Sequence, residues 1–408
     1  MTGARTLEPQ LNWKRTMWIL WAANFVITSG MNLVIPFLPF YIETLGVTAT
    51  DEVERWSGWI FSAQFVTSVI FQPIWGSFAD KHGRKPMLIR AALGMGIVTV
   101  LMGIAGSVWQ LLILRLINGV FSGFVSMAIS LQASVTPDKN AGEALGTMQT
   151  GAIAGGLIGP LLGGYLAEFM DYTHIFYLTG ALHFAACAVV VFFVREPHTH
   201  KRAERAPGKG AADLKLLLPL IPVYVAATIT QIGMMSIEPI VTIYAETIYA
   251  GADLTMVAGF AVAATGMANL VGAPVLGRIA DRVGQRKILY FSLAAASCMY
   301  IPQAFAANIY MLLAGRFLLG LFIGGMLPSL NALVRHLAPK KIQATAFGFN
   351  SSAIFLGNFT GPLIGSGVAA AFGFRSVFFV TMAILLINAL MIFKNKHLDV
   401  PARTDPKE

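Results

Sequence analysis

The segment GSFADKHGRKP, residues 76–86, returns about 200 residues later as GRIADRVGQRK, residues 277–287. Repeats of this kind are sought first, because a missed repeat leads to a wrong fold. Other segments recur at nearly the same offset: LLILRLINGVFSG from Leu111 as LLAGRFLLGLFIG from Leu312, GLIGPLLGG from Gly156 as GNFTGPLIG from Gly357, and IPFLPFYIET from Ile35 as EPIVTIYAET from Glu238. The constant offset predicts a duplicated unit, a plan that some transporters use.

The composition indicates a membrane protein. Apolar residues make up 56% of the 408 residues and charged residues only 12%, whereas about 25% of an ordinary soluble domain is charged. A helix that crosses a hydrocarbon core of roughly 30 Å needs about 20 apolar residues. Twelve stretches of this kind lie at approximately 17–41, 56–79, 86–106, 109–134, 144–167, 174–194, 216–244, 254–277, 286–306, 308–334, 346–371 and 376–393.

The most polar internal segment divides these stretches into six and six. It covers residues 195–215 and has the composition of a linker. We therefore predict an all-α integral membrane protein whose twelve transmembrane helices form two pseudo-symmetric six-helix bundles. The first bundle is residues 1–194, the linker is cytoplasmic, and the second bundle is residues 216–408 with a short cytoplasmic tail.

Basic residues gather on one predicted side of the membrane. The opposite side carries only Arg55 and Arg375 among Lys and Arg, and the positive-inside rule makes the basic side cytoplasmic. An even number of spans then places both termini in the cytoplasm of a multi-pass protein of the inner membrane. The same asymmetry accounts for the net charge of +9, so the basic balance does not indicate nucleic-acid binding.

The stretch GAIAGGLIGPLLGG, residues 151–164, is rich in glycine although it lies in a predicted span. Its glycines at four-residue spacing form one helical stripe without side chains, and Pro160 is expected to bend the helix. In a bilayer such small-residue faces allow backbones to approach closely. Spacing alone leaves two interpretations open: static packing, or a seal on which the two halves rock. The stripe consists of Gly151, Gly155, Gly159 and Gly163.

Several of these segments resemble motifs of the major facilitator superfamily. GSFADKHGRK resembles its G-x-x-x-D-x-x-G-R-K loop between spans two and three, GLIGPLLGG resembles the span-five motif of the twelve-span drug:proton antiporters, and RLINGVFSG resembles their span-four arginine motif. NWKR, FLPFYIETLGV and WSGWIFS are similar to multidrug exporters of the MdtG type. The resemblance implies proton-driven export by alternating access, with the proton gradient as energy source and no cofactor.

The chain departs from the family pattern at two places. The second copy of the loop motif has Gln285 where the first has Arg84. Some relatives carry an acid in span one, where this chain has Asn24. Proton coupling is therefore not placed in span one.

Glu238 is the leading candidate for proton coupling. It is the sole charged side chain in the stretch 216–244, and an ionisable residue inside a membrane is a functional candidate by default. Alternatively, Glu238 lies near enough to the outer surface to meet interfacial water. The resemblance implies that Arg115 takes part in coupling. Snorkelling toward the membrane surface is the alternative for Arg115 and the favoured expectation for Arg316, while His183 is expected to be a core histidine.

The resemblance also implies a conformational latch in the first loop motif. In that interpretation, Asp80 meets a helix N-terminus or an arginine in the outward-facing state and releases it in the inward-facing one. Asp281 would be a weaker counterpart. A simple cytoplasmic turn with retention charges is the alternative. The latch residues are Gly76, Asp80, Gly83, Arg84, Lys85 and Asp281.

A drug pocket needs apolar and aromatic walls with a few polar groups, and flexible methionines suit varied ligands. For each candidate taken singly, ordinary packing or helix contact is the favoured interpretation. The substrate-binding candidates are Trp21, Asn24, Phe25, Gln64, Asn118, Gln149, Gln231, Met234, Met235 and Asn269.

These patterns predict a proton-coupled multidrug efflux antiporter, and hence a contribution to antibiotic resistance. The expected substrates are lipophilic, with cations among the candidates, and the protein is expected to act as a monomer whose other partners are protons and the lipid bilayer. A narrower exporter of sugars or metabolites is the nearest alternative. A membrane enzyme is a more distant one, since the sequence shows no Walker loop, H-E-x-x-H motif, or Cys/His cluster for a metal.

Overall fold

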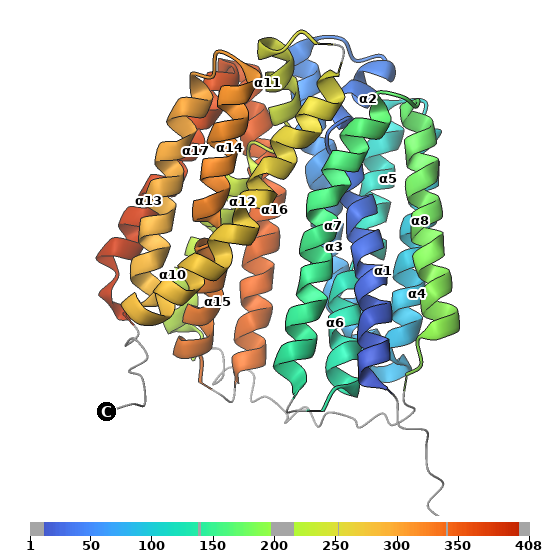
Figure 1. Cartoon of the computed structure of the whole chain (residues 1–408), viewed down its shortest axis with the longest axis vertical. Helices are drawn as coiled ribbons and strands as arrows, with labels where there is room; N and C mark the ends of the chain where they lie inside the picture. Colours follow the sequence, from blue (N-terminus) through green and yellow to red (C-terminus); the bar gives the residue numbers. More distant parts are fainter. Residues whose placement is uncertain (1–11, 138–139, 197–215, 252, 340–341, 400–408) are drawn as a thin grey trace, which may run out of the picture.

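The computed structural model describes residues 12–137, 140–196, 216–251, 253–339 and 342–399. Two bundles of helices stand side by side (Figure 1). The first half contains α1 (Trp13–Leu33), α2 (Leu38–Thr44), α3 (Thr50–His82), α4 (Arg84–Gly103), α5 (Val108–Phe121), α6 (Phe124–Val135), α7 (Ala141–Ala167) and α8 (Tyr172–Phe193).

The second half repeats this order of elements. It contains η2 (Leu218–Leu220), α10 (Ile221–Met235), α11 (Val241–Ile248), α12 (Leu254–Val283), α13 (Gln285–Ala304), α14 (Ile309–Ile323), α15 (Met326–Leu337), α16 (Gln343–Phe372), α17 (Phe374–Lys394) and η4 (Lys396–Leu398). Of the predicted linker 195–215, only residues 195 and 196 lie within the described residues.

The helices are long and apolar enough to cross a membrane. Within the described ranges, nine spans pass tests of length and hydropathy, and the bent pair of α1 and α2 makes a tenth. The helices α3 and α13 have 33 and 20 residues, so they also reach the length that a bilayer requires. Together these spans account for the twelve predicted from the sequence.

Four spans that the sequence predicts as continuous are broken, and the breaks occupy corresponding positions in the repeat. The chain bends by 50° between α1 and α2, near Pro36 and Pro39. It breaks between α5 and α6 at Gly123, whose φ is +107°, and between α10 and α11 around Pro239. The fourth break separates α14 from α15. Proline removes a helical N–H donor and a positive φ favours glycine, which explains the first three breaks.

Close packing within each half depends on glycines, which have no side chain to keep the helix backbones apart. A Cβ atom on Gly155 of α7 would lie 2.6 Å from the carbonyl oxygen of Phe25 on α1, and one on Gly163 would lie 1.9 Å from that of Leu33. The corresponding contact in the second half joins Gly365 of α16 to Ser236, beyond the end of α10. The glycine stripe thus packs α7 against α1 inside one bundle, as the static interpretation states, and not against the other half.

The two halves meet along two seams that match each other in the repeat. In one seam, a Cβ atom on Gly259 of α12 would lie 2.5 Å from the carbonyl oxygen of Pro160 on α7. In the other, a Cβ atom on Gly58 of α3 would lie 2.9 Å from that of Pro362 on α16. Figure 1 shows α12 beside α7 near the top of the molecule and inclined away from it below. The seams therefore join the halves toward one end.

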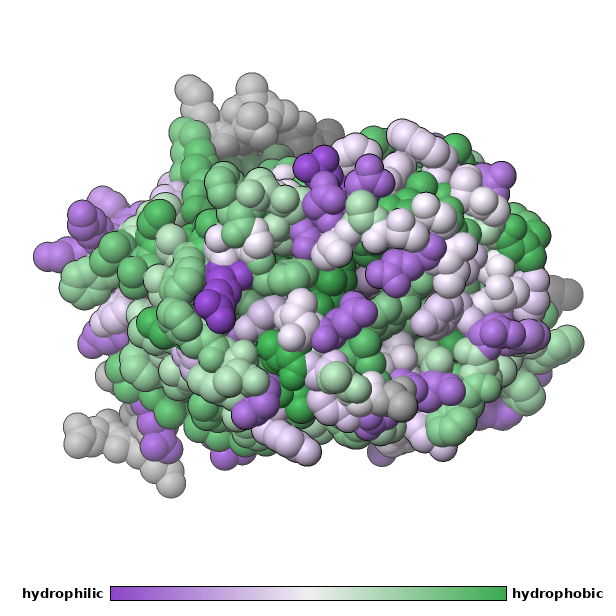
Figure 2. All heavy atoms as spheres, turned by 90° about the horizontal axis from the view of Figure 1, so that it is seen from above, coloured by the Kyte–Doolittle hydropathy of each residue, from purple (hydrophilic) through white to green (hydrophobic). Residues whose placement is uncertain are grey.

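The two ends of the bundle differ in charge. We call the top of Figure 1, where α2 and α11 lie, the acidic end, because Glu43 belongs to α2 and Glu246 to α11. Glu168 follows the end of α7 on the same side. Seen from that end, polar residues lie scattered among apolar ones (Figure 2). The opposite, basic end carries the loops predicted as cytoplasmic, such as 81–85 and 282–287. The seams lie toward the acidic end.

Replacing Gly163 by alanine is expected to destabilise the protein by about 1–3 kcal/mol, because the new methyl group would overlap the backbone of α1. Gly156→Ala on the same helix is a matched control, since no atom lies within 4 Å of its Cβ position. Thermal unfolding of the purified variants measures both. Equal melting temperatures for the two variants would contradict the packing described here.

Candidate functional site

A buried ion pair occupies the break between α10 and α11. Arg316 on α14 points its Nη2 to Oε1 of Glu238 at 3.1 Å, and the two side chains are only 2% and 16% exposed. Arg316 also donates from Nε to the carbonyl oxygen of Ala261 on α12 at 2.9 Å. The expectation that Arg316 snorkels toward the membrane surface is therefore wrong, because Glu238 and α12 hold it inside the bundle.

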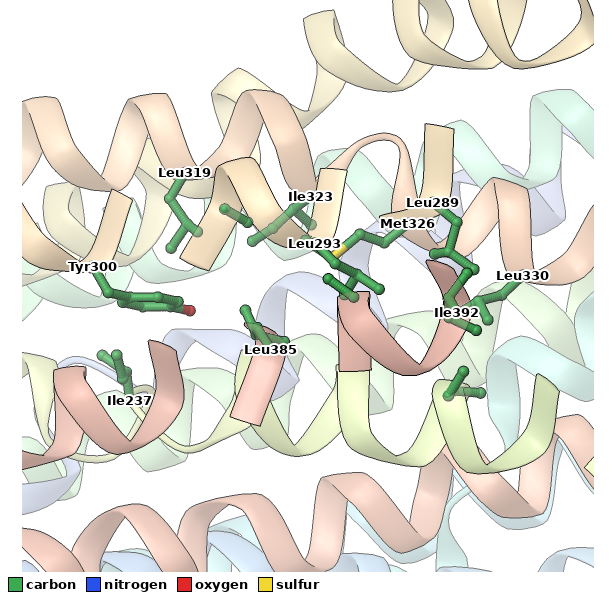
Figure 3. Close-up of a cluster of buried hydrophobic side chains, with 14 of the residues drawn as sticks. Ile237, Leu289, Leu293, Tyr300, Leu319, Ile323, Met326, Leu330, Leu385 and Ile392 are labelled. Atoms are coloured by element: carbon green, nitrogen blue, oxygen red, sulfur yellow. The ribbon is translucent and has the colours of Figure 1, made fainter. Parts of the chain in front are cut away.

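The residues on both sides of Glu238, Ile237 and Pro239, are buried, as is Leu319, one turn along α14 from Arg316. Figure 3 shows Tyr300, Ile237 and Leu319 gathered in the core of the second half, near Leu385. The hydroxyl of Tyr300 donates to the carbonyl oxygen of Gly233 on α10 at 3.5 Å. The ion pair joins the broken span to α14.

Arg115 differs from its repeat partner Arg316. It is 6% exposed, and its Nη1 donates to Oε1 of Gln64 on α3 at 3.1 Å. No ion pair to Arg115 is found in the described part of the chain. Snorkelling does not apply here either, because the side chain is buried beside a neutral amide.

A small cavity inside the first half adjoins Arg115. Both Gln64 and Asn118, predicted to bind substrate, line it. His183 also lines this cavity and is 1% exposed, in agreement with the expectation of a core position. These polar side chains form an internal site of the first bundle.

Other predicted substrate residues form two small groups. On α1, Trp21 and Phe25 stack with their ring centroids 5.8 Å apart, and the indole of Trp21 donates to the hydroxyl of Thr150 at 3.0 Å. Between α10 and α16, Gln231 donates to the amide oxygen of Asn358 at 2.6 Å. Sequence reasoning missed Asn358, because a lone asparagine in a span carries no spacing signal.

The remaining substrate candidates differ in exposure. Asn24 is fully buried, so it is not accessible to a ligand in this conformation. Gln149 is exposed, whereas Met234, Met235 and Asn269 are half-buried.

The predicted latch loop is bound by Glu196, the second residue of the predicted linker. The backbone N–H groups of Arg84 and Lys85 donate to the two carboxylate oxygens of Glu196, at 2.7 and 2.9 Å. Gly83, with φ of +94°, allows this approach, since a Cβ atom there would lie 2.7 Å from the Glu196 carboxylate. Glu196 thereby caps α4, whose first N–H groups lack helical partners. Sequence reasoning missed Glu196, although it directly follows the sixth predicted span.

The other predicted latch groups lie in different surroundings. The Arg84 guanidinium donates to the hydroxyl of Ser130 at 2.8 Å, while a Cβ atom on Gly76 would meet open space. The side chain of Asp80 lies outside the described residues, so its predicted contact stays a prediction. Asp281 accepts a hydrogen bond from Gln285 at 3.0 Å, within its own loop.

Comparison with known proteins agrees with this architecture. The family model "Major Facilitator Superfamily" matches residues 20–251 and again residues 223–408. The chain belongs to the major facilitator superfamily. The first match covers most of the first half and the second covers most of the second half, and the two overlap at residues 223–251.

Relatives within the superfamily cover nearly the whole chain. It is 40% identical over 387 residues to the multidrug resistance protein MdtG of Enterobacter lignolyticus (strain SCF1), covering 94% of this chain and 92% of the relative. It is 39% identical to MdtG of Proteus mirabilis (strain HI4320), with coverages of 94% and 96%.

Solved structures of superfamily members share the fold. A bacterial homologue of the lysosomal transporter Spinster, in an inward-facing and occupied conformation, has a TM-score of 0.77 at 15% identity, covering 96% of this chain and 98% of that one. A D-xylose-proton symporter has a TM-score of 0.78 at 14% identity, with coverages of 95% and 98%.

Removing one member of the buried pair is expected to cost more stability than removing both. Arg316→Met leaves the Glu238 carboxylate without its partner, which should lower stability by roughly 3 kcal/mol. Adding Glu238→Leu should restore much of the loss. A double-mutant cycle on melting temperatures measures the coupling, with the exposed Arg375→Ala as control. Additive effects of the two changes would contradict a direct interaction.

Proposed function

We propose that this superfamily member exports lipophilic compounds, with cations among the candidate substrates, across the cytoplasmic membrane in exchange for protons. Full-length relatives named for multidrug resistance support the class of substrate. The observation that carries the proposal is the buried pair of Glu238 and Arg316 at a break in a transmembrane span. An acid held inside the membrane is the kind of group that proton-coupled transporters use.

Protonation of Glu238 would change the contact between α14 and the break that joins α10 to α11. When Glu238 takes up a proton, its charge attraction to Arg316 is lost, and Arg316 keeps its bond to the carbonyl of Ala261. Proton uptake and release thus weaken and restore a contact between α14 and the break that joins α10 to α11. A break of this kind is a natural place for a change in helix direction.

Glu238 is a better proton carrier than Arg115. An arginine side chain stays protonated in proteins, and Arg115 is bonded to a neutral amide. We assign Arg115 a supporting role: its fixed positive charge, with Gln64 and Asn118, keeps the first-half cavity polar. Water held there could pass protons onward.

The conformation described here corresponds to the inward-facing stage of the proposed cycle. Both seams join the halves toward the acidic end, and the basic end is placed in the cytoplasm by the positive-inside rule. In that orientation both termini are cytoplasmic, and substrate enters from the cytoplasmic side. The aromatic pair of Trp21 and Phe25 and the amide pair of Gln231 and Asn358 are the proposed substrate contacts.

Glu238→Gln is expected to abolish proton-driven drug transport while leaving drug exchange intact. The amide keeps the shape of the side chain but cannot gain or lose the coupling proton. The measurement uses proteoliposomes with an imposed proton gradient and a fluorescent lipophilic cation. Glu246→Gln is the matched control, because Glu246 is an exposed acid in the neighbouring helix α11.

Two outcomes would contradict this assignment. Normal proton-driven uptake by a folded Glu238→Gln variant would make Glu238 structural and shift coupling toward the Arg115 cavity. Absence of any drug movement by the wild type would contradict multidrug transport itself and favour a narrower substrate, such as a sugar or another metabolite.

A further inference from the structure

A side chain of the first half caps a helix of the second half. Glu168 follows the last residue of α7, and its Oε1 accepts hydrogen bonds from the backbone N–H groups of Thr255 at 2.8 Å and Met256 at 3.2 Å. Both donors belong to the first turn of α12. The first N–H groups of a helix lack helical partners and carry partial positive charge. A carboxylate at this position is therefore a favourable contact across the two halves.

The residue that should cap α12 is engaged elsewhere. Asp253 directly precedes the helix, which is the place where aspartate usually accepts from the first turn. Its side chain makes no such bond, because Oδ1 accepts a hydrogen bond of 2.5 Å from the hydroxyl of Tyr249. The start of α12 thus depends on a cap from the other half of the molecule.

The close approach of the α7 and α12 backbones brings the Glu168 carboxylate to the start of α12. A Cβ atom on Gly164 of α7 would lie 2.4 Å from the carbonyl oxygen of Thr255, so the helices touch one turn before Glu168. In the matching seam between α16 and α3, the close contact is made by Gly58, which corresponds to Gly259, and Ser366 stands in place of Gly164. There, however, Ala370 occupies the position that corresponds to Glu168. The carboxylate cap is therefore absent from that position in the second seam.

We propose that Glu168 is a clasp that holds the acidic end of the transporter closed and thereby sets the balance between its inward-facing and outward-facing states. This inference rests on the proposed alternating-access function. The seam between α7 and α12 must separate whenever the acidic end opens, and the two hydrogen bonds from α12 must then pass to water. The clasp stabilises the closed arrangement and is lost in the open one.

Removal of the clasp is expected to raise the outward-facing population about 5- to 30-fold, the effect of losing one charged helix cap. Glu168→Ala removes the acceptor, and Glu168→Gln keeps an oxygen without the charge and should have a smaller effect. Asp171→Asn is the matched control: Asp171 is an exposed acid three residues away that contacts His174 rather than α12.

Distances between spin labels measure the populations in the purified full-length protein in lipid nanodiscs, after both native cysteines are replaced by serine. One label pair, at exposed Glu52 and Tyr310, reports on the acidic end, and another, at exposed His82 and His336, reports on the basic end. The clasp predicts longer distances at the acidic end and shorter ones at the basic end in Glu168→Ala. The control should match the parent protein.

Unchanged distances in both Glu168 variants would overturn the proposal. Should Glu168→Ala fail to fold, Glu168→Gln decides alone, since it preserves the volume of the side chain. If Glu168 only packs locally, its removal would loosen α12 without changing the distances between the spin labels. That result would also count against the proposal. Because the measurement needs neither substrate nor proton gradient, its result does not depend on whether the protein exports drugs.

Discussion

Close contact between helix backbones is the constraint on which this structure depends. In a bilayer, apolar side chains gain little by meeting one another, so helices associate where small residues let their backbones touch. The stripe of α7 meets α1 in this way, and Gly259 and Gly58 extend the same principle to the seams between the halves. Contacts within each bundle and contacts between the bundles thus use one kind of surface.

The breaks in the spans present polar groups to the interior in a way that continuous helices would not. A continuous helix satisfies its own backbone groups and presents only side chains to its neighbours. At the α10–α11 break, Glu238 is instead presented to Arg316 in the interior. The tightly packed glycine contacts hold the helices in place, while the breaks provide the polar groups through which a proton could change their arrangement. The proposed Glu168 clasp lies at the seam between α7 and α12, which is closely packed here and must separate when the acidic end opens.

The sequence predicted the overall architecture well, because its signals are repeated and local. Apolar stretches of bilayer length, matching motifs in the two halves and the glycine spacing each follow from chemistry that any bilayer imposes. The breaks were missed as helix ends, although Pro36, Pro239 and Gly123 are visible in the sequence, because apolar character continues across them.

The site was less predictable, since contacts between distant residues leave no pattern in one sequence. Arg115 and Arg316 occupy matching positions, yet one meets a glutamine and the other an acid. Glu196 and Glu168 stand just beyond the ends of spans, where acids are common and their capping contacts cannot be read. Asn24 was expected at the pocket because it is polar, but the fold buries it.

The central claim is that this protein transports a drug only in exchange for protons. The most direct measurement imposes a gradient of a lipophilic cation across proteoliposomes of the wild-type protein at equal pH on both sides, and follows internal pH with a trapped dye. The account predicts a proton flux opposite to the drug flux that is absent from protein-free liposomes. Drug movement through the protein with no change of internal pH would contradict it.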